Sequence, residues 1–393
     1  MPSLTTELGY LALILALLVV PRALQRFLVP APLSCFAFGL VAALTLEGVG
    51  RDTTLTLLAT LGISSLFLFA GLEIEVGALR RGLGPLTAHL GVRSVTLAAS
   101  TWAAMAVFDL PWNAACLLAL ALMTPSTGFI LETLGRLGLD EQERFWVTTK
   151  SIGGELLALL VLFVVLQSVS MQRLGWSSAA LVAMIALLPV LFTALGRYVV
   201  PYAAGSEFSL LVMVGLIAAY LTKQLGVYYL VGAFLVGMVA RLLRERMPAL
   251  ASEENLHAVK LFASFFVPFY FFNSGVNVPA GALQWKSLWV GLALAAAVTP
   301  FRIGVVWAQR RFLVHEDSRS SLRVAVALAP TLIFTLVLAG ILRERYAIPD
   351  ALYGGLLVYA ALTTMLPSLV LSRPFDLDVT DMSPTSERPL GRA

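Results

Sequence analysis

The sequence is a succession of long apolar runs, separated by short breaks that contain charged residues, proline or glycine. A transmembrane helix needs about 20 predominantly apolar residues, and most of these runs approach or exceed that length. Hydrophobic residues make up 59% of the 393 residues and charged residues only 13%, whereas an ordinary soluble domain has about 25% charged residues. Since only helices or closed barrels satisfy the backbone inside a bilayer, runs of this length predict an all-α polytopic membrane protein.

The apolar runs predict about thirteen transmembrane helices. The expected spans are 8–25, 28–46, 54–74, 85–108, 113–137, 143–169, 177–201, 206–224, 228–246, 257–276, 287–312, 320–343 and 351–371. Residues 1–371 would thus form a single membrane unit. Residues 372–393 are polar and rich in proline and serine, so we expect them to form a short disordered tail.

Basic residues are concentrated in the loops that follow odd-numbered predicted helices, for example Arg80, Arg81, Arg310 and Arg311. The positive-inside rule places such loops in the cytoplasm. The amino terminus is then outside and the carboxyl terminus cytoplasmic, as an odd number of helices requires. We expect a multi-pass protein of a bacterial inner or plasma membrane.

One acidic residue, Glu155, interrupts the apolar run 148–166. At 1.5 Å per residue it lies about 18 Å from the cytoplasmic end of its predicted helix. Placing a carboxylate at this depth in the bilayer costs a few kcal/mol of insertion free energy. Such residues usually belong to a functional site, so Glu155 is the first candidate for one. Gly153 and Gly154 precede it and would let an ion, water or another backbone come close. The alternative is a static salt bridge that only fixes helix packing.

Two predicted helices contain a proline close to the middle of the membrane. The first has the sequence Met-Thr-Pro-Ser-Thr-Gly at 123–128, and the second has Ala-Pro-Thr at 329–331. Proline removes a backbone donor, and hydroxyl side chains can satisfy the freed groups. Broken helices seven apart that enter from opposite sides are typical of inverted repeats with a binding site at the midplane. The alternative is two ordinary proline kinks.

These breaks and the acid define the candidate site. Hydroxyl groups of Thr124, Ser126, Thr127 and Thr331 would bind an ion together with Glu155. Arg302 lies about 15 Å from the cytoplasmic end of its predicted helix, a depth that makes it a candidate ion-pair partner of Glu155.

Other polar residues are candidates for the ion pathway. Lys150 precedes Glu155 by five residues and could instead extend to the membrane surface. Glu73, with Glu75, would flank the cytoplasmic entrance. Asn273 would line an outward opening or satisfy neighbouring helix backbone. Arg93 and Lys260 are interpreted as residues of the membrane interface.

The sequence lacks the motifs that would indicate a nucleotide-binding protein, an enzyme or a metal-binding protein. There is no nucleotide-binding GxxxxGK[ST] or GxGxxG motif and no nucleophile–base constellation, so we expect neither a cofactor nor an enzyme. The three histidines follow no metal-ligand pattern, and Cys35 and Cys116 are interpreted as small core residues. The net charge of +4 comes from residues at helix ends rather than from a nucleic-acid-binding surface.

Three segments carry a resemblance to a known family. Residues 66–75 (Leu-Phe-Leu-Phe-Ala-Gly-Leu-Glu-Ile-Glu), residues 121–128 and residues 269–275 (Phe-Tyr-Phe-Phe-Asn-Ser-Gly) resemble segments of the monovalent cation:proton antiporters, particularly the Kef-like branch. The resemblance covers nearly all of residues 10–371. It implies a thirteen-helix sodium/proton antiporter fold, inverted repeats with crossing broken helices, and a homodimer.

The resemblance also implies that the helices divide into a scaffold domain and a core domain. Scaffold helices would lie in about 8–53 and 177–246, and core helices in about 54–169 and 257–371. The family's ion-binding acid would fall on the pair Gly154-Glu155, and its basic residue on Arg302. Glu155 would then bind a proton and a monovalent cation, Na⁺ or K⁺, in turn. A single acid in place of a pair favours electroneutral exchange.

Cation entry would be helped by Ser126, Thr127, Thr331 and main-chain carbonyls freed at the two breaks. Two other readings remain open. A sodium-coupled organic-anion symporter of the same architecture would need a roomier cavity, with Arg302 facing the substrate. A non-transporting membrane sensor would be unaffected by the loss of Glu155.

Overall fold

The structure, a computed structural model, describes residues 4–45, 50, 52–74, 83–168, 170–203, 205–226, 229–244 and 252–371. The regular elements in these ranges are all helical. They are α1 (Leu4–Leu24), η1 (Gln25–Phe27), α2 (Ala31–Thr45), α3 (Thr53–Leu72), α5 (Leu83–Phe108), α6 (Trp112–Met123), α7 (Thr127–Thr133), η3 (Leu134–Arg136), α8 (Glu141–Gln167), α9 (Met171–Tyr198), α10 (Glu207–Gln224), α11 (Tyr229–Leu242), α12 (Glu253–Val276), η4 (Ala280–Ala282), α13 (Trp285–Leu313), α14 (Ser318–Ala327), α15 (Leu332–Tyr346) and α16 (Asp350–Leu371). The predicted tail 372–393 and Glu75 lie outside the described residues.

Each predicted span overlaps one or more of these helices. Among the described residues ten helices are long and apolar enough to cross a membrane, or eleven if α14 and α15, bent by 46°, form one broken span. The shorter apolar helices Ala31–Thr45 and Leu230–Leu242 occupy two further predicted spans. The class of all-α multi-span membrane protein is confirmed, while the number of thirteen crossings stays a prediction.

The outer surface is apolar where lipid would cover it. On α9 the side chains of Val182, Leu187 and Val190 are each more than 60% exposed. A soluble protein rarely exposes contiguous apolar surface of this kind. In a bilayer, lipid tails cover such a face.

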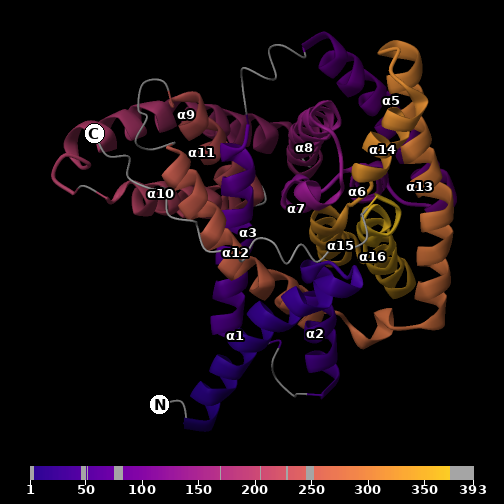
Figure 1. Cartoon of the computed structure of the whole chain (residues 1–393), viewed down its shortest axis with the longest axis horizontal. Helices are drawn as coiled ribbons and strands as arrows, with labels where there is room; N and C mark the ends of the chain where they lie inside the picture. Colours follow the sequence, from indigo (N-terminus) through magenta and orange to yellow (C-terminus); the bar gives the residue numbers. More distant parts are fainter. Residues whose placement is uncertain are drawn as a thin grey trace, which may run out of the picture.

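The helices form two packing groups, which lie side by side in Figure 1. In the first group, which we call the α3 group, α3 packs against α11 and α12, α12 against α2, and α10 against α11. In the second, the α13 group, α13 packs against α14 and α16, α15 against α6 and α16, and α5 against α6 and α8. The short helix α7 contacts both α8 and α3, so it lies where the groups meet.

The division into scaffold and core expected from sequence, in which residues 54–74 and 257–276 belong to the core, stays a prediction. Here α3 and α12 pack with α2, α10 and α11. Glycines make the close approach possible: a Cβ atom on Gly62 would meet the main chain of Phe266, and one on Gly71 the main chain of Phe234. Small residues at helix crossings are typical of membrane proteins, where close backbone packing drives association.

Candidate ion-binding site

The two proline-containing breaks touch each other in the middle of the molecule. The first break separates α6 from α7, and the second separates α14 from α15. The main-chain N–H of Ser126 donates to the carbonyl of Pro330 at 2.8 Å. In return, the hydroxyl oxygen of Ser126 accepts a hydrogen bond from the N–H of Ile333 at 2.9 Å. The breaks therefore form a crossing that is held by hydrogen bonds in both directions.

Carbonyl groups at the end of α6 are also satisfied by the second repeat. The Thr335 hydroxyl donates to the carbonyl of Ala121 at 2.7 Å, and the Tyr359 hydroxyl donates to that of Leu122 at 2.6 Å. The last carbonyls of a helix have no partner within the helix and need one elsewhere. Side chains of α15 and α16 supply it here.

Two arginines donate hydrogen bonds to carbonyl groups at the carboxyl ends of α6 and α14, the helices that precede the two breaks. Arg302, buried on α13, donates to the carbonyls of Ala329 at 2.8 Å and Leu328 at 3.1 Å. Arg93, half-buried on α5, donates to the carbonyl of Met123 at 2.8 Å. A helix carries about half a negative charge at its carboxyl end, so a cation there is stabilising.

The predicted ion pair between Arg302 and Glu155 is not formed in the part of the chain that the structure describes. Arg302 instead binds two carbonyls and the Tyr359 hydroxyl, which lies 3.1 Å from Nη1. The carbonyls at the second break provide partial negative charge closer to the guanidinium than the carboxylate does, which explains the difference.

Glu155 itself is buried, with 2% of its surface exposed. Its Oε2 atom has no hydrogen-bond partner, and neither do the hydroxyl oxygens of Thr124 and Thr127, which are also buried. The Thr127 hydroxyl is close enough to interact with the carboxyl group, although the two do not meet the geometry of an ordinary hydrogen bond. Three oxygen-bearing side chains of the predicted site thus keep oxygens that can accept a ligand.

The remaining predicted hydroxyl groups are already engaged. Ser126 accepts from Ile333, and the Thr331 hydroxyl bonds to that of Thr363 at 3.1 Å. These bonds hold the crossing together and join α16 to the second break, while binding of an ion by either hydroxyl group stays a prediction.

Gly154 creates space for Arg93. A Cβ atom at position 154 would lie 3.1 Å from Nε and 3.2 Å from Cζ of Arg93, which is tighter than most Cβ contacts. Sequence reasoning placed Arg93 at the membrane interface and so missed this contact. The signal was available, because Arg93 is a charge inside an apolar span, as Arg302 is.

Lys150 does not extend to the membrane surface. It is 1% exposed, and its ammonium group donates to Oε1 of Gln309 at 3.0 Å and lies 3.4 Å from Nδ1 of His89. Of the other pathway candidates, Asn273 accepts a side-chain hydrogen bond from Asn277 near the end of α12, and Glu73 lies half-buried at the end of α3.

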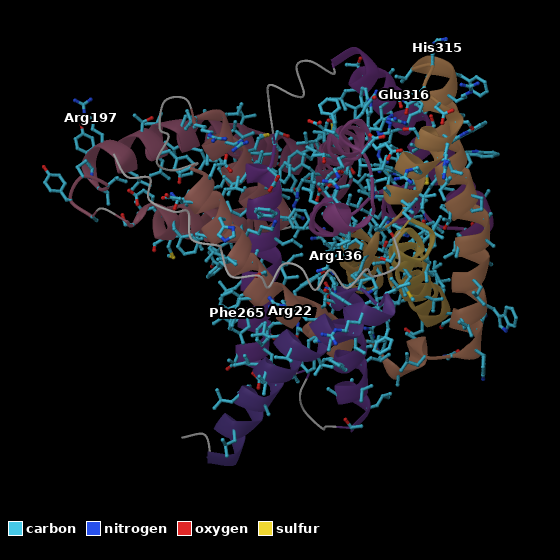
Figure 2. All side chains as sticks on the ribbon, viewed as in Figure 1. Arg22, Arg136, Arg197, Phe265, His315 and Glu316 are labelled. Atoms are coloured by element: carbon cyan, nitrogen blue, oxygen red, sulfur yellow. The ribbon has the colours of Figure 1, made fainter. Side chains whose placement is uncertain are left out.

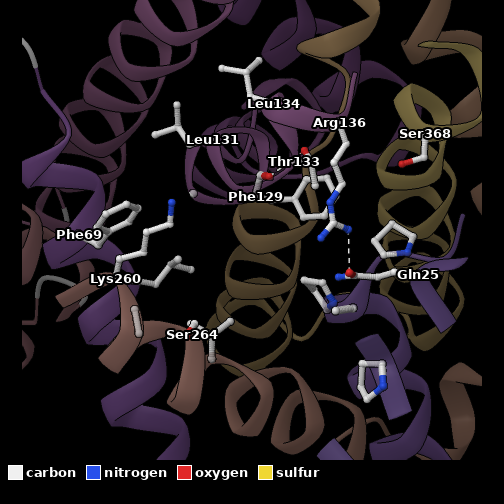
Figure 3. Close-up of a pocket in the computed structure, with 18 of the residues that line it drawn as sticks. Gln25, Phe69, Phe129, Leu131, Thr133, Leu134, Arg136, Lys260, Ser264 and Ser368 are labelled. Atoms are coloured by element: carbon white, nitrogen blue, oxygen red, sulfur yellow. Dashed lines mark hydrogen bonds between the residues drawn. The ribbon is translucent and has the colours of Figure 1, made fainter. Parts of the chain in front are cut away.

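A large cavity of about 1190 Å³ opens between the two packing groups (Figure 3). Its lining includes Gly128, one residue after Thr127, and Ile152, one turn before Glu155. Glu73 and Lys260 line the same cavity. The cavity therefore leads from the protein surface to the neighbourhood of Glu155.

The lining of this cavity includes several basic side chains. Arg22 and Arg136 are two of them, and Figure 2 labels both near the middle of the view. Arg136 donates to the side-chain oxygen of Gln25 at 2.7 Å, which links η3 to η1 across the cavity.

Crossing broken helices, a buried carboxylate and a cavity that reaches toward it define a secondary transporter. The chain belongs to the sodium/hydrogen exchanger family: the family described as "Sodium/hydrogen exchanger, transmembrane" matches residues 11–376. Membership of this family makes the protein a cation:proton exchanger rather than an enzyme. No curated protein sequence matches the chain.

Solved structures show the same fold. The sodium proton antiporter MjNhaP1 from Methanocaldococcus jannaschii at pH 8 superposes with a TM-score of 0.67 at 15% sequence identity, covering 94% of this chain and 96% of that one. A second structure of that antiporter, from an electron-microscopy map, gives a TM-score of 0.64 at 17% identity with the same coverage. The antiporter fold expected from sequence is confirmed.

Proposed function

We propose that the protein exchanges one monovalent cation, Na⁺ or K⁺, for one proton across the bilayer, and that Glu155 binds the two in turn. The observation that carries this proposal is the buried carboxylate of Glu155 at the crossing, with an oxygen that has no partner beside the similarly unpartnered Thr127 hydroxyl. Oxygen ligands of this kind suit hard cations. A proton on the same carboxylate would remove the charge that attracts the cation, so the two compete.

The one-for-one stoichiometry rests on the number of buried acids. Among the acidic side chains that the structure describes, only Glu143 and Glu155 are buried. Glu143 pairs with Arg323 at 3.0 Å, near the start of α8. Glu155 alone then carries exchangeable charge. At this stoichiometry one pH unit, about 1.4 kcal/mol, supports a tenfold cation gradient.

Access to Glu155 changes when the α13 group moves against the α3 group. The cavity between the groups supplies the open side, and α7, which carries Thr127, lies at their boundary. We place this open side in the cytoplasm with the carboxyl terminus, and the amino terminus outside. The α3 group then acts as the scaffold and forms the contact of a homodimer.

One feature favours a second candidate, a sodium-coupled organic-anion symporter. The large cavity has a volume of about 1190 Å³, and Arg22 and Arg136 line it. Arg302, however, binds carbonyls at the second break and does not line this cavity. The exchanger therefore accounts better for the position of the buried charges.

The decisive experiment measures proton movement in proteoliposomes when Na⁺ or K⁺ is added outside. Wild-type protein should respond, and Glu155→Gln, which keeps the shape but not the charge, should reduce exchange at least a hundredfold. Glu254→Gln is the matched control, because Glu254 is exposed in the first turn of α12. Equal exchange by Glu155→Gln and wild type would refute the proposal, and cation uptake that requires an organic acid would favour the symporter.

A further inference from the structure

A second, much smaller cavity lies between α5, α8 and α13, and its lining is basic. Its volume is about 30 Å³, and His89, Arg93, Lys150 and Arg302 line it. Thr299 adds a hydroxyl group, and the rest of the lining contains no acidic residue. Three side chains that ordinarily carry positive charge thus line one small cavity.

The fixed charges around this cavity are not balanced by nearby carboxylates. Arginine stays protonated in proteins, so Arg93 and Arg302 contribute two positive charges. The carboxyl ends of α6 and α14 offset about half a charge each. The two buried carboxylates that the structure describes, Glu143 and Glu155, do not line the cavity. An excess of positive charge remains, and burying an unpaired charge is costly.

The lining also has more hydrogen-bond donors than acceptors. Arg93 donates one hydrogen bond, to Met123, which leaves four of its five N–H groups without one. The hydroxyl of Thr299 has no partner, and the Lys150 ammonium group donates to Oε1 of Gln309, which lies outside the lining, at 3.0 Å. Surplus donors together with surplus positive charge are the properties of an anion site.

The size of the cavity restricts the anion. A space of this volume suits a ligand about the size of a water molecule or a monatomic ion. We propose that the cavity binds a single halide, which is chloride under cellular conditions, through Arg93, Lys150 and Thr299. The ion balances the positive charge of the guanidinium groups and contacts side chains of α5, α8 and α13, so it holds these three helices together. This proposal does not depend on Glu155 or on the direction of exchange.

The first test compares thermal unfolding of purified protein in potassium chloride and in potassium gluconate at equal ionic strength. Chloride should raise Tm in a saturable manner, because a ligand that binds only the folded state stabilises it by mass action. Lys150→Met and Thr299→Val should each raise the chloride concentration at half-effect at least fivefold. Lys223→Met is the control, since Lys223 is exposed on α10 and should leave the response unchanged.

The second test locates the ion. Crystals grown in bromide should show an anomalous scattering peak between Arg93, Lys150 and Thr299. Equal Tm in chloride and gluconate, or a chloride response identical in wild type and both cavity variants, would overturn the proposal. Bromide peaks confined to the protein surface would do the same.

Discussion

The hydroxyl oxygen of Ser126, in the first break, accepts a hydrogen bond from the main-chain N–H of Ile333, the second residue of α15. The N-cap residue of α15, Thr331, makes no side-chain capping hydrogen bond. Ser126, which precedes α7, caps the first turn of α15 instead. This single side chain ties the two broken helices together at the depth of the candidate site.

Ser126→Ala should destabilise the folded protein by about 1–3 kcal/mol, because the buried N–H of Ile333 loses its acceptor. Thermal unfolding in detergent measures the effect. Thr60→Ala is the control: the Thr60 hydroxyl is exposed and bonds within its own helix, to Thr56. A Ser126→Ala variant as stable as Thr60→Ala would show that water replaces the cap.

Gly154→Ala should cost about 1–3 kcal/mol, the range for overpacking, since the new Cβ atom would press on Arg93. Arg93→Ala removes the side chain that the new Cβ atom would press on, so the loss of stability caused by Gly154→Ala should be smaller in the Arg93→Ala background. The double variant should therefore be more stable than the sum of the two single effects predicts. Gly91→Ala, on the same helix as Arg93, meets nothing within 4 Å and should be neutral or slightly stabilising. Strict additivity of the two changes would contradict the contact.

Arg302→Met should lower both Tm and transport, because the carbonyls of Leu328 and Ala329 lose their donors. Arg302→Lys should recover less than half of the transport rate, since one ammonium group does not reproduce the planar fork that reaches both carbonyls. Initial rates in proteoliposomes, normalised to folded protein, give the comparison. Full rescue by lysine would mean that only the charge matters.

Asp52 gives a pH-dependent contribution to stability outside the membrane spans. Burial alone would raise the pKa of this carboxyl group, but hydrogen bonds from Tyr10, Leu55 and Thr54 lower it below its usual value overall. A lowered pKa stabilises the fold at pH values above the ordinary pKa of aspartate, and the contribution is lost as pH falls through the folded value.

Asp52→Ala should therefore cost about 0.5–2 kcal/mol at neutral pH, the range for an N-cap residue. The difference from wild type should shrink below about pH 4, where the carboxyl group becomes protonated. Thermal unfolding of both proteins across pH 3–7 measures it. A difference that stays constant over this range would exclude the charge as its cause.

The sequence predicted the helices well because run length and proline position are local properties. Each expected span contains helix, and both breaks fall at the predicted prolines, Pro125 and Pro330. Depth along the membrane also follows from residue counting, which is why Glu155, Arg302 and the two breaks were all assigned to the same level.

Counting residues does not show which way a side chain points around its helix. Arg302 has the depth expected of a partner for Glu155, yet it turns toward Leu328 and Ala329. Lys150 is buried because Gln309, 159 residues further along the chain, supplies an acceptor. The grouping of α3 with α12 likewise depends on neighbours across the membrane plane, about which a single sequence says nothing.

Main-chain oxygens at the carboxyl ends of α6 and α14 and at Pro330 already accept hydrogen bonds from Arg93, Arg302, Tyr359, Thr335 and Ser126. In the proposed exchange an alkali ion at Glu155 thus finds these carbonyls engaged, and we expect it to keep part of its hydration shell beside the side-chain oxygens of Glu155, Thr124 and Thr127. Discrimination between Na⁺ and K⁺ requires a cage that replaces that water at fixed distances. A half-hydrated ion is bound mainly by its charge, so the transporter should carry both ions with only modest preference.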